Sequence, residues 1–518
     1  MIRRKSPKTP DNSSRAGGLT KVEESARSQS VWMSVARIAA AVLTMAIPMV
    51  LARVLDQTTF GYYKQIFLVA STMGVLTLGI PGSLYYFVPR DPEQSQRYQV
   101  QSALLLVGLG LLGGTIVLVA SPTIERLFDA PVGEYLPWIA LFVALSIPAA
   151  MIPTSPMVDR RARLAATLVT GLDLARAVLL VVVALVTRSL LAIVLISVVV
   201  VVFRVGSLAS YLVWRRKQHP GRGSGSVLRS QLAYSLPFAG AAVIAMARSK
   251  LHSYFVAAGF SAAEFAVYAV ATLSIPLIGQ FTQTVGEVVV IENSKHYAAD
   301  RTGEMRRVWH RATFSLALLL LPIFVIAVLF AQDIMVVLFG PAYAEGAPIF
   351  RVYMLIVPLS VLLASPMLRA TADLRVMLLA DFASLVVAVG SLLLLIGPLG
   401  PLGAVASLVI ARATYIALAT GRTAHRLQLS PRNLLPWRGL IMMLLVASAT
   451  GLLASALTTG LHPVLRVFLG GGLAFVAYGT IVFFTGLVPE SERDLLVAIL
   501  RRTGVARILS RGSDAGPE

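Results

Sequence analysis

Long apolar stretches recur along almost the whole chain and restrict the folds open to it. A helix crosses the hydrocarbon core of a membrane with roughly 20 mainly apolar residues, and the sequence holds about fourteen stretches of this kind. They cover residues 31–54, 60–87, 99–120, 136–157, 165–187, 190–214, 232–257, 262–290, 312–330, 348–368, 376–396, 402–420, 438–457 and 464–487. Because 57% of the 518 residues are hydrophobic and only 14% are charged, a water-soluble protein is excluded. We predict an all-α, polytopic membrane protein.

Positive charge is unevenly distributed among the loops between these stretches. Most of the 45 Lys and Arg residues lie in the N-terminal tail, the even-numbered loops and the C-terminal tail. Cytoplasmic loops carry such an excess, so we expect a multi-pass protein of the inner (plasma) membrane with both termini in the cytoplasm. These basic loops account for the net charge of +20. We expect them to contact anionic membrane lipids, and we expect no nucleic-acid partner.

Short matches between the two halves indicate an internal repeat. The tripeptide Ser-Pro-Met ends the fourth and the tenth stretch, at residues 155–157 and 365–367, and Leu-Phe precedes them at 127–128 and 338–339. Six stretches, an even number, separate the copies, so the copies are parallel and related by a pseudo-twofold axis along the membrane normal. We therefore predict two six-helix lobes and two extra C-terminal helices, a plan typical of transporters with a central substrate site.

The repeat divides the chain into six segments. The two long ones are the lobes, and the others are the tails, the connecting loop and the extra helices. We predict a cytoplasmic N-tail at 1–30, an N-lobe at 31–218, a cytoplasmic loop at 219–231, a C-lobe at 232–426, two further helices within 427–487, and a cytoplasmic C-tail at 488–518 that carries an interfacial amphipathic helix.

The sequence lacks the motifs that a catalytic, metal or nucleotide site would need. It contains no cysteine, no Walker A motif and no HExxH motif, and its six histidines are scattered. GLGLLG at 108–113 lies inside an apolar stretch with no strand before it, so it is not a dinucleotide fingerprint. We therefore expect that the protein is not an enzyme and that it has no catalytic residue, metal or cofactor.

Charged side chains inside the apolar stretches are candidate functional residues, because a charge in hydrocarbon is costly. Arg248, Lys250 and His252 lie in the seventh stretch, and Arg37 lies in the first. These two stretches are equivalent in the repeat, so we expect the four side chains in a central cavity, where they suit a phosphate or diphosphate. In the alternative, the seventh stretch ends near Ala247 and its cations lie at the outer interface.

The eighth stretch carries a polar stripe. Gln280, Gln283 and Glu287 are spaced three and four residues apart and so lie on one helical face. Such a stripe faces protein or water, so we include these residues in the candidate cavity, where Glu287 would neutralise a cation or carry a coupling proton. In the alternative, a neighbouring helix satisfies the stripe.

Four more cations lie near the ends of their apolar stretches. Long basic side chains at such positions extend to the membrane surface. We therefore assign this position to Arg53, Lys64, Arg351 and Arg466.

Two interhelical ion pairs are predicted from depth in the membrane. Asp173 in the fifth stretch and Arg204 in the sixth lie at similar depths, and their repeat equivalents Asp381 and Arg412 do the same. Because consecutive helices are usually adjacent, we predict the structural pairs Asp173–Arg204 and Asp381–Arg412, one in each lobe. Arg176, one turn from Asp173, is the rival partner.

Several segments resemble one membrane-protein family. LARVLDQTTFGYY at 51–63 resembles the first outer loop of the oligosaccharide-lipid flippases, the polysaccharide-export branch of the multidrug/oligosaccharidyl-lipid/polysaccharide exporter superfamily. YSLPFAG at 234–240, FSAAEFAVYAVATLSIPLIGQ at 260–280 and VVLFGPAYAEGAPIFRVYML at 336–355 resemble the seventh helix, the eighth helix and the loop before the tenth helix of that family. Many relatives carry an Asp near the position of residues 248–250, and this chain does not.

The resemblance implies a translocator that moves polyprenyl-diphosphate-linked oligosaccharides from the inner to the outer leaflet by alternating access. The product would be a surface glycan such as O-antigen (lipopolysaccharide), capsule or exopolysaccharide, with a polysaccharide polymerase and other export components as partners and H⁺ or Na⁺ as a coupling ion. Three alternatives stay open: a peptidoglycan-precursor flippase, a multidrug or ion antiporter, which would need an acidic cavity, and a glycan polymerase or ligase, which would need a large outer loop.

Overall fold

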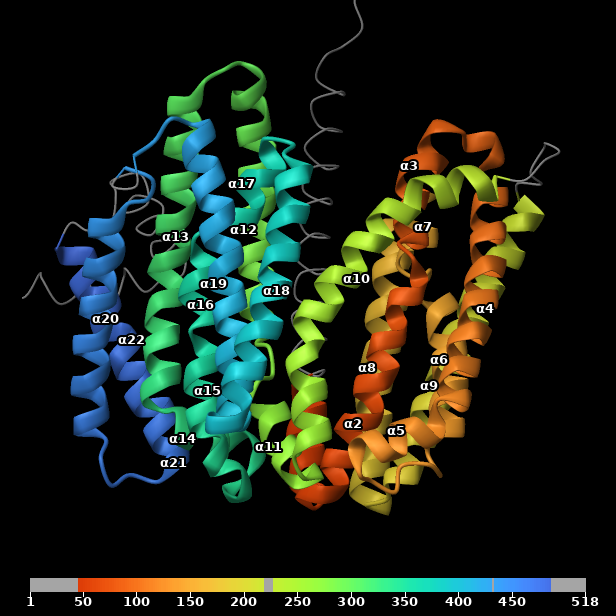
Figure 1. Ribbon diagram of the computed structural model, residues 1–518, viewed down its shortest axis with the longest axis horizontal. Helices are drawn as coiled ribbons and strands as arrows, with labels where there is room; N and C mark the ends of the chain where they lie inside the picture. Colours follow the sequence, from red (N-terminus) through yellow and green to blue (C-terminus); the bar gives the residue numbers. More distant parts are fainter. Residues whose placement is uncertain (1–44, 219–226, 431–432, 486–518) are drawn as a thin grey trace, which may run out of the picture. The chain divides into compact units, whose positions relative to one another are not determined.

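A computed structural model describes residues 45–218, 227–430 and 433–485 of the chain (Figure 1). All regular secondary structure in this part is helical, as predicted. Within the described residues, twelve helical segments are long and apolar enough to cross a membrane, and they match the predicted stretches two to seven and nine to fourteen. Of the first stretch, the described part is the short apolar helix Met45–Val54. Arg37, the two tails and most of the loop predicted at 219–231 lie outside the described residues.

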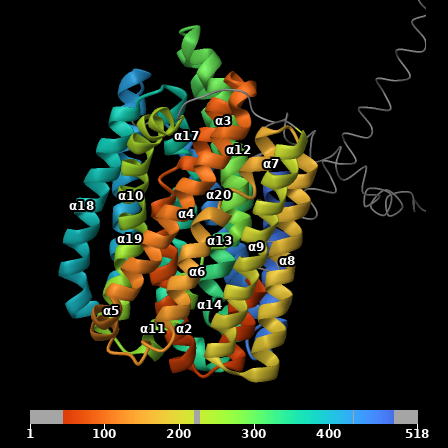
Figure 2. The same cartoon turned by 90° about the vertical axis from the view of Figure 1, so that its right-hand side faces the viewer.

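The helices form two compact units. Unit 1 comprises the chain up to Leu55 and the segments Met73–Ser121 and Gly133–Phe238. Its helices are η1 (Gly74–Thr77), α3 (Ile80–Arg90), η2 (Pro92–Gln94), α4 (Ser95–Val119), α6 (Leu136–Ala149), α7 (Thr154–Val158), α8 (Ala162–Thr187), α9 (Leu190–Gln218) and the start of α10 (Leu228–Gly259). Within it, α6 packs on α4 and α9, and α8 lies beside α9 (Figure 2).

Two glycines allow the close packing of α4 on α6. A Cβ atom added to Gly110 would lie 2.2 Å from the carbonyl oxygen of Ala144, and one added to Gly114 would lie 2.8 Å from that of Ala140. Small residues permit such backbone approach between membrane helices. The two glycines of the GLGLLG region therefore have a packing role.

Unit 2 comprises Asp56–Thr72, Pro122–Val132 and the chain from Ala239 onward. Its helices are α2 (Gln57–Met73), α5 (Ser121–Phe128), the remainder of α10, α11 (Ala262–Ala271), α12 (Pro276–Ala298), α13 (Thr302–Leu329), α14 (Ala331–Phe339), η3 (Pro341–Gly346), α15 (Ala347–Met354), α16 (Ile356–Val361), α17 (Ala364–Ala370), α18 (Leu374–Leu399), α19 (Pro401–Arg426), α20 (Trp437–Leu457), α21 (Pro463–Leu465), η4 (Arg466–Gly470) and α22 (Gly471–Phe484). Within it, α18 lies beside α19 and α13 beside α20 (Figure 1).

The helix α2 belongs to unit 2, although the predicted N-lobe, residues 31–218, includes it. Its contacts with the later part of the chain explain this placement. A Cβ atom at Gly61 would lie 2.0 Å from the carbonyl oxygen of Ala262 in α11, so only glycine allows this approach. Gln65 is fully buried and donates a hydrogen bond of 3.1 Å to the carbonyl oxygen of Ala257 in α10.

The eighth predicted stretch is interrupted between α11 and α12. Pro276 is the first residue of α12 and has no N–H, and it disfavours helical geometry in the residue before it. Ile275 is accordingly extended, with ψ of 108°. The N–H groups of Ser274 and Ile275 have no hydrogen-bond acceptor within the described part of the chain. The interruption therefore exposes backbone polar groups in the middle of an apolar stretch.

Candidate functional site

A cavity of about 690 Å³ lies within unit 2. It is bordered by α2, α10, α11, the segment that joins α11 to α12, and α19. Four cationic side chains line it: Lys64, Arg248, Lys250 and Arg412. No Asp or Glu occurs among its described lining residues. The lining therefore carries a strong excess of positive charge.

One carboxylate behind the lining partly compensates this charge. Asp381 of α18 forms an ion pair of 3.3 Å with Arg248 of α10, and both side chains are mostly buried. Arg412 of α19 also interacts electrostatically with Asp381, but lies beyond ion-pair distance. The guanidinium groups of Arg248 and Arg412 lie 5.4 and 5.9 Å from the ring centre of Tyr415. A single carboxylate thus serves two guanidinium groups.

The two lysines have no carboxylate partner within the described residues. The ammonium of Lys64 lies 5.2 Å from the ring centre of Phe60, which supplies a weak cation–π interaction. Lys250 and Lys64 repel each other electrostatically. Two like charges held together away from bulk water favour the binding of an anion between them.

His252 has a different environment from the cations beside it. Its side chain is buried, and Nδ1 shares a hydrogen bond of 2.5 Å with the hydroxyl of Tyr268 in α11. This bond joins α10 to α11, the helix that precedes the interruption of the eighth stretch. The geometry supports a positioning role for His252 in the cavity wall.

Arg248, Lys250 and His252 all line this cavity of unit 2. The helix α10 continues past them to Gly259, so it does not end near Ala247. Arg37 lies outside the described residues.

The three residues of the predicted polar stripe lie on α12 and have different environments. Gln283 donates a hydrogen bond of 3.1 Å to Glu287 and lines a second cavity of about 390 Å³ in unit 2. Gln280 and Glu287 are exposed and line neither cavity. The second cavity shares Arg412 and Ser274 with the first, so the two cavities adjoin.

Of the two predicted interior ion pairs, one is confirmed and one is wrong. Asp173 and Arg204 form an ion pair between α8 and α9. Asp381 pairs with Arg248 instead of Arg412, because α10 brings a competing guanidinium to the same carboxylate. Arg176 does not pair with Asp173.

Two cations assigned to the membrane surface have other surroundings. Lys64 lines the cavity, because α2 belongs to unit 2. Arg466 forms an ion pair of 3.0 Å with Asp333 of α14. The positions of Lys64 and Arg466 near the ends of apolar stretches do not indicate that one lines a cavity and the other forms an ion pair.

Further ion pairs tie helix ends together, and the sequence analysis missed them. In unit 1, Asp159 after α7 pairs with Arg215 of α9 at 2.5 Å. In unit 2, Asp373 after α17 pairs with Arg422 and Arg426 of α19 at 3.0 and 3.2 Å. The similar offsets of these residues in the repeat were the available signal.

No group of three or more His, Asp or Glu side chains in the described segments is placed to hold a metal ion. The chemistry of the unit 2 cavity is that of an anion-binding site: guanidinium and ammonium donors, a histidine held by a tyrosine, and open backbone groups at the interrupted helix.

Comparison with known proteins gives one family and one fold. The sequence pattern of a family described as "Polysaccharide biosynthesis protein" matches residues 50–348. No curated protein matches the chain.

Several solved structures are similar to most of the chain. The lipid II flippase MurJ, in an inward closed conformation, has a TM-score of 0.71 and 12% identity over 88% of this chain and 100% of MurJ. An inward-facing multidrug resistance transporter of the MATE family, in the MOP superfamily, has a TM-score of 0.56 and 14% identity over 75% of this chain and 94% of its own. A mutant of the MATE transporter VcmN from Vibrio cholerae has a TM-score of 0.52 and 13% identity, with coverage of 79% and 99%. At these identities the likeness shows the fold, that of multi-pass membrane transporters.

Proposed function

Because the chain belongs to the polysaccharide biosynthesis protein family, we propose that it is a flippase for polyprenyl-diphosphate-linked oligosaccharides. It would move these lipids from the inner to the outer leaflet of the plasma membrane by alternating access, as a step of surface-polysaccharide synthesis. Its structural neighbours are transporters and flippases, not enzymes.

The cationic cavity of unit 2 is the observation that carries this proposal. A diphosphate needs several positive donors, and Lys64, Lys250 and Arg412 face the cavity without a carboxylate within ion-pair distance in the described chain. Ammonium and guanidinium groups bind phosphate oxygens with charge-assisted hydrogen bonds. Arg248 would supply a further donor to the diphosphate, because its guanidinium would leave Asp381 when an anion approaches.

The cavity also argues against a carrier of cationic drugs. Such a substrate needs carboxylates, and no described lining residue is one. A flippase of the peptidoglycan lipid precursor is the second candidate, favoured by the TM-score of 0.71 to MurJ. Its substrate also carries a diphosphate, so the sugar distinguishes the two candidates.

A flipping assay in proteoliposomes tests the proposal. The full chain would be reconstituted with a fluorescent polyprenyl-diphosphate disaccharide, with lipid II, or with a cationic dye, and outward movement measured by chemical quenching. We expect the wild type to move a diphosphate lipid and Lys250→Gln and Lys64→Gln to reduce the rate at least about tenfold, since each removes a charge from the diphosphate site.

Lys295→Gln, which removes an exposed lysine from the last turn of α12, is the matched control and should keep the wild-type rate. Movement of lipid II alone would favour the second candidate. Movement of the cationic dye without either diphosphate lipid would refute both.

A further inference from the structure

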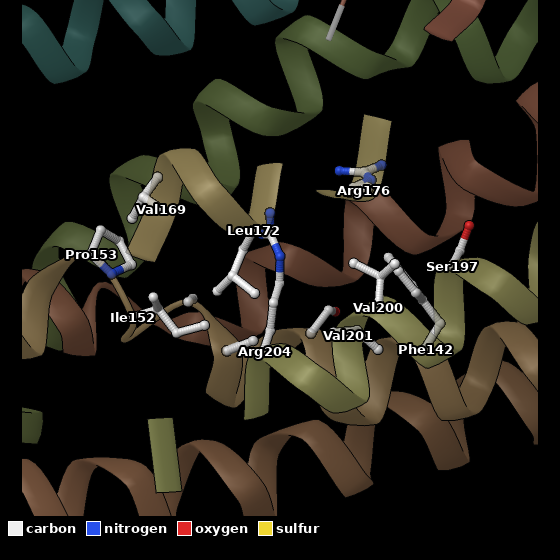
Figure 3. A pocket seen from close by; sticks show the side chains of 13 residues that line it. Phe142, Ile152, Pro153, Val169, Leu172, Arg176, Ser197, Val200, Val201 and Arg204 are labelled. Atoms are coloured by element: carbon white, nitrogen blue, oxygen red, sulfur yellow. The ribbon is translucent and has the colours of Figure 1, made fainter. Parts of the chain in front are cut away.

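Unit 1 contains a cavity of its own, of about 230 Å³, between α6, α8 and α9 (Figure 3). Most of its lining is apolar and includes Phe142, Leu172 and Val200. Two guanidinium groups also line it, Arg176 from α8 and Arg204 from α9. This volume is far more than the share of about 30 Å³ that one water molecule takes in the liquid.

Both arginines lie near the middle of membrane-spanning helices. Arg176 is about 21 Å along the axis from the start of α8 and about 17 Å from its end, at 1.5 Å per residue. Arg204 is about 21 Å from each end of α9. An arginine reaches the membrane surface only from near a helix end, so neither guanidinium group reaches that surface.

The charges in this region do not balance. Asp173 pairs with Arg204, whereas Arg176 has no hydrogen bond or ion pair within the described chain. The Nε atom of Arg204 is buried and also has no partner there. The carboxylate of Asp173 thus compensates Arg204 alone, and the positive charge of Arg176 has no ion-pair partner among the described residues.

The remaining polar side chains of the cavity do not resolve this imbalance. The hydroxyl of Ser146 donates to the carbonyl oxygen of Val143 at 3.1 Å, and that of Ser197 donates to Ile193 at 2.7 Å. Both donors are therefore used within their own helices. The free side-chain donors of the described cavity lining are therefore guanidinium N–H groups, which require an acceptor.

The equivalent position in unit 2 has no cation. By the repeat, Arg176 corresponds to Ser384, which is fully buried and donates a hydrogen bond of 2.8 Å to the carbonyl oxygen of Asp381. The unpartnered arginine is therefore specific to unit 1, and packing of the repeated fold does not demand it.

We propose that the cavity between α6, α8 and α9 binds a phosphate-type anion, held by the fork of N–H donors of Arg176 and by Nε of Arg204. A planar guanidinium matches two phosphate oxygens at once, and burial strengthens this interaction. The phosphate would come from the headgroup of an anionic lipid or from free inorganic phosphate. The site shares no residue with the cavity of unit 2, so it does not depend on the proposed transport function.

The test compares Arg176→Gln with Arg188→Gln in the purified, delipidated full-length chain. Arg188 is exposed at the C-terminal end of the same helix, outside the basic loops expected to contact anionic lipids, and serves as the matched control. One arm titrates phosphatidylglycerol against diacylglycerol, which lacks the phosphate, and follows binding by native mass spectrometry. The other arm titrates inorganic phosphate by calorimetry.

We expect Arg176→Gln to weaken binding at least about tenfold in one arm, because the bidentate contact is lost, and Arg188→Gln to leave it unchanged. A loss with phosphatidylglycerol assigns a lipid headgroup, and a loss with phosphate assigns the free anion. Wild-type affinity of Arg176→Gln in both arms overturns the proposal.

A measurement on the wild type covers the case in which Arg176→Gln does not fold. Phenylglyoxal labels accessible arginines, and peptide mass spectrometry locates the label. The proposal requires phosphatidylglycerol or phosphate to protect Arg176 at least about fivefold and to leave Arg188 unprotected. Equal labelling of Arg176 with and without both ligands overturns it.

Discussion

The same Asp–Arg arrangement behaves differently in the two repeat copies. In unit 1, Asp173 of α8 pairs with Arg204 of α9, its neighbour in the hairpin. In unit 2, the equivalent Asp381 pairs with Arg248 of α10, and Arg412 is left facing the cavity. One additional arginine on α10 therefore turns a closed structural pair into a charged cavity wall.

The ion pairs at the helix ends, by contrast, are alike in both copies. In unit 1 an ion pair joins Asp159, which follows the short helix α7, to Arg215 near the end of α9. In unit 2 the ion pairs join Asp373, which follows the short helix α17, to Arg422 and Arg426 near the end of α19. The repeat thus keeps its scaffold at the helix ends and differs in the interior, where the cavity of unit 2 lies. The candidate site is therefore located by where the two repeat copies differ, more than by charge alone.

The largest expected effect is on the closed interior pair. Asp173→Asn leaves two guanidinium groups uncompensated at mid-span, and we expect a loss of about 3–5 kcal/mol in stability, with a low folded yield. Asp381→Asn should cost less, because Arg248 and Arg412 face a roomy polar cavity. Thermal melting of the purified variants checks this difference.

The swap Asp173→Arg with Arg204→Asp should partly restore the yield, because it rebuilds a pair of opposite charges between the same two helices. Equal losses of stability in Asp173→Asn and Asp381→Asn would contradict the difference between the closed ion pair of unit 1 and the cavity-facing arginines of unit 2.

The second effect concerns the helix-end pairs. Arg215 is nearly buried, contacts Asp159 through Nε and Nη2, and also donates to Ser95 at 2.7 Å. We expect Arg215→Gln to cost about 2–3 kcal/mol, because the mostly buried Asp159 loses its compensating charge and keeps only neutral donors from Tyr211 and Gln99.

In unit 2 the same role is shared. Arg422 and Arg426 are 36% and 39% exposed and both contact Asp373, so Arg422→Gln should cost less than about 1 kcal/mol. Chemical denaturation in detergent micelles measures both variants. A larger loss for Arg422→Gln than for Arg215→Gln would contradict the assignment of a shared role.

A third effect sharpens the contrast between the interiors. Asp381→Asn removes the carboxylate that occupies Arg248, so we expect pyrophosphate to bind about tenfold more tightly, or about 1.4 kcal/mol. Asp173→Asn should leave pyrophosphate binding at the unit 2 cavity unchanged. Calorimetry with the Lys250→Gln background separates this cavity from other sites, since the gain should shrink there.

The smallest effect depends on pH. Burial by itself would raise the pKa of Asp373, but the hydrogen bond from Arg422 and the charges of Arg422 and Arg426 outweigh it and lower the pKa below the ordinary 3.8. A depressed folded-state pKa contributes stability above pH 3.8 and loses it as the pH falls through the folded value. The Tm difference between wild type and Asp373→Asn should therefore be constant near neutral pH and shrink below about pH 3.8.

Sequence reasoning succeeded where a single helix or a hairpin decides the outcome. Apolar length located the membrane-spanning helices, and matched depth in consecutive helices located Asp173 beside Arg204. It failed at Asp381, because Arg248 comes from a helix far earlier in the chain. Lys64 was misplaced for a similar reason: position along an apolar stretch does not tell which unit a helix joins.

The interruption between α11 and α12 has a consequence for hydration. The N–H groups of Ser274 and Ile275 lack acceptors in the described chain, and in a dry hydrocarbon setting each would cost several kcal/mol. Ser274 lines the cavity that holds Lys64 and Lys250, so a hydrated cavity would satisfy these backbone groups and raise the local dielectric constant. Two unit charges 4 Å apart interact by about 1 kcal/mol in bulk water but by about 4 kcal/mol at an effective dielectric constant of 20. Under the proposed function, an entering anion would have to displace this water, so anions that give up their hydration shell easily would be favoured.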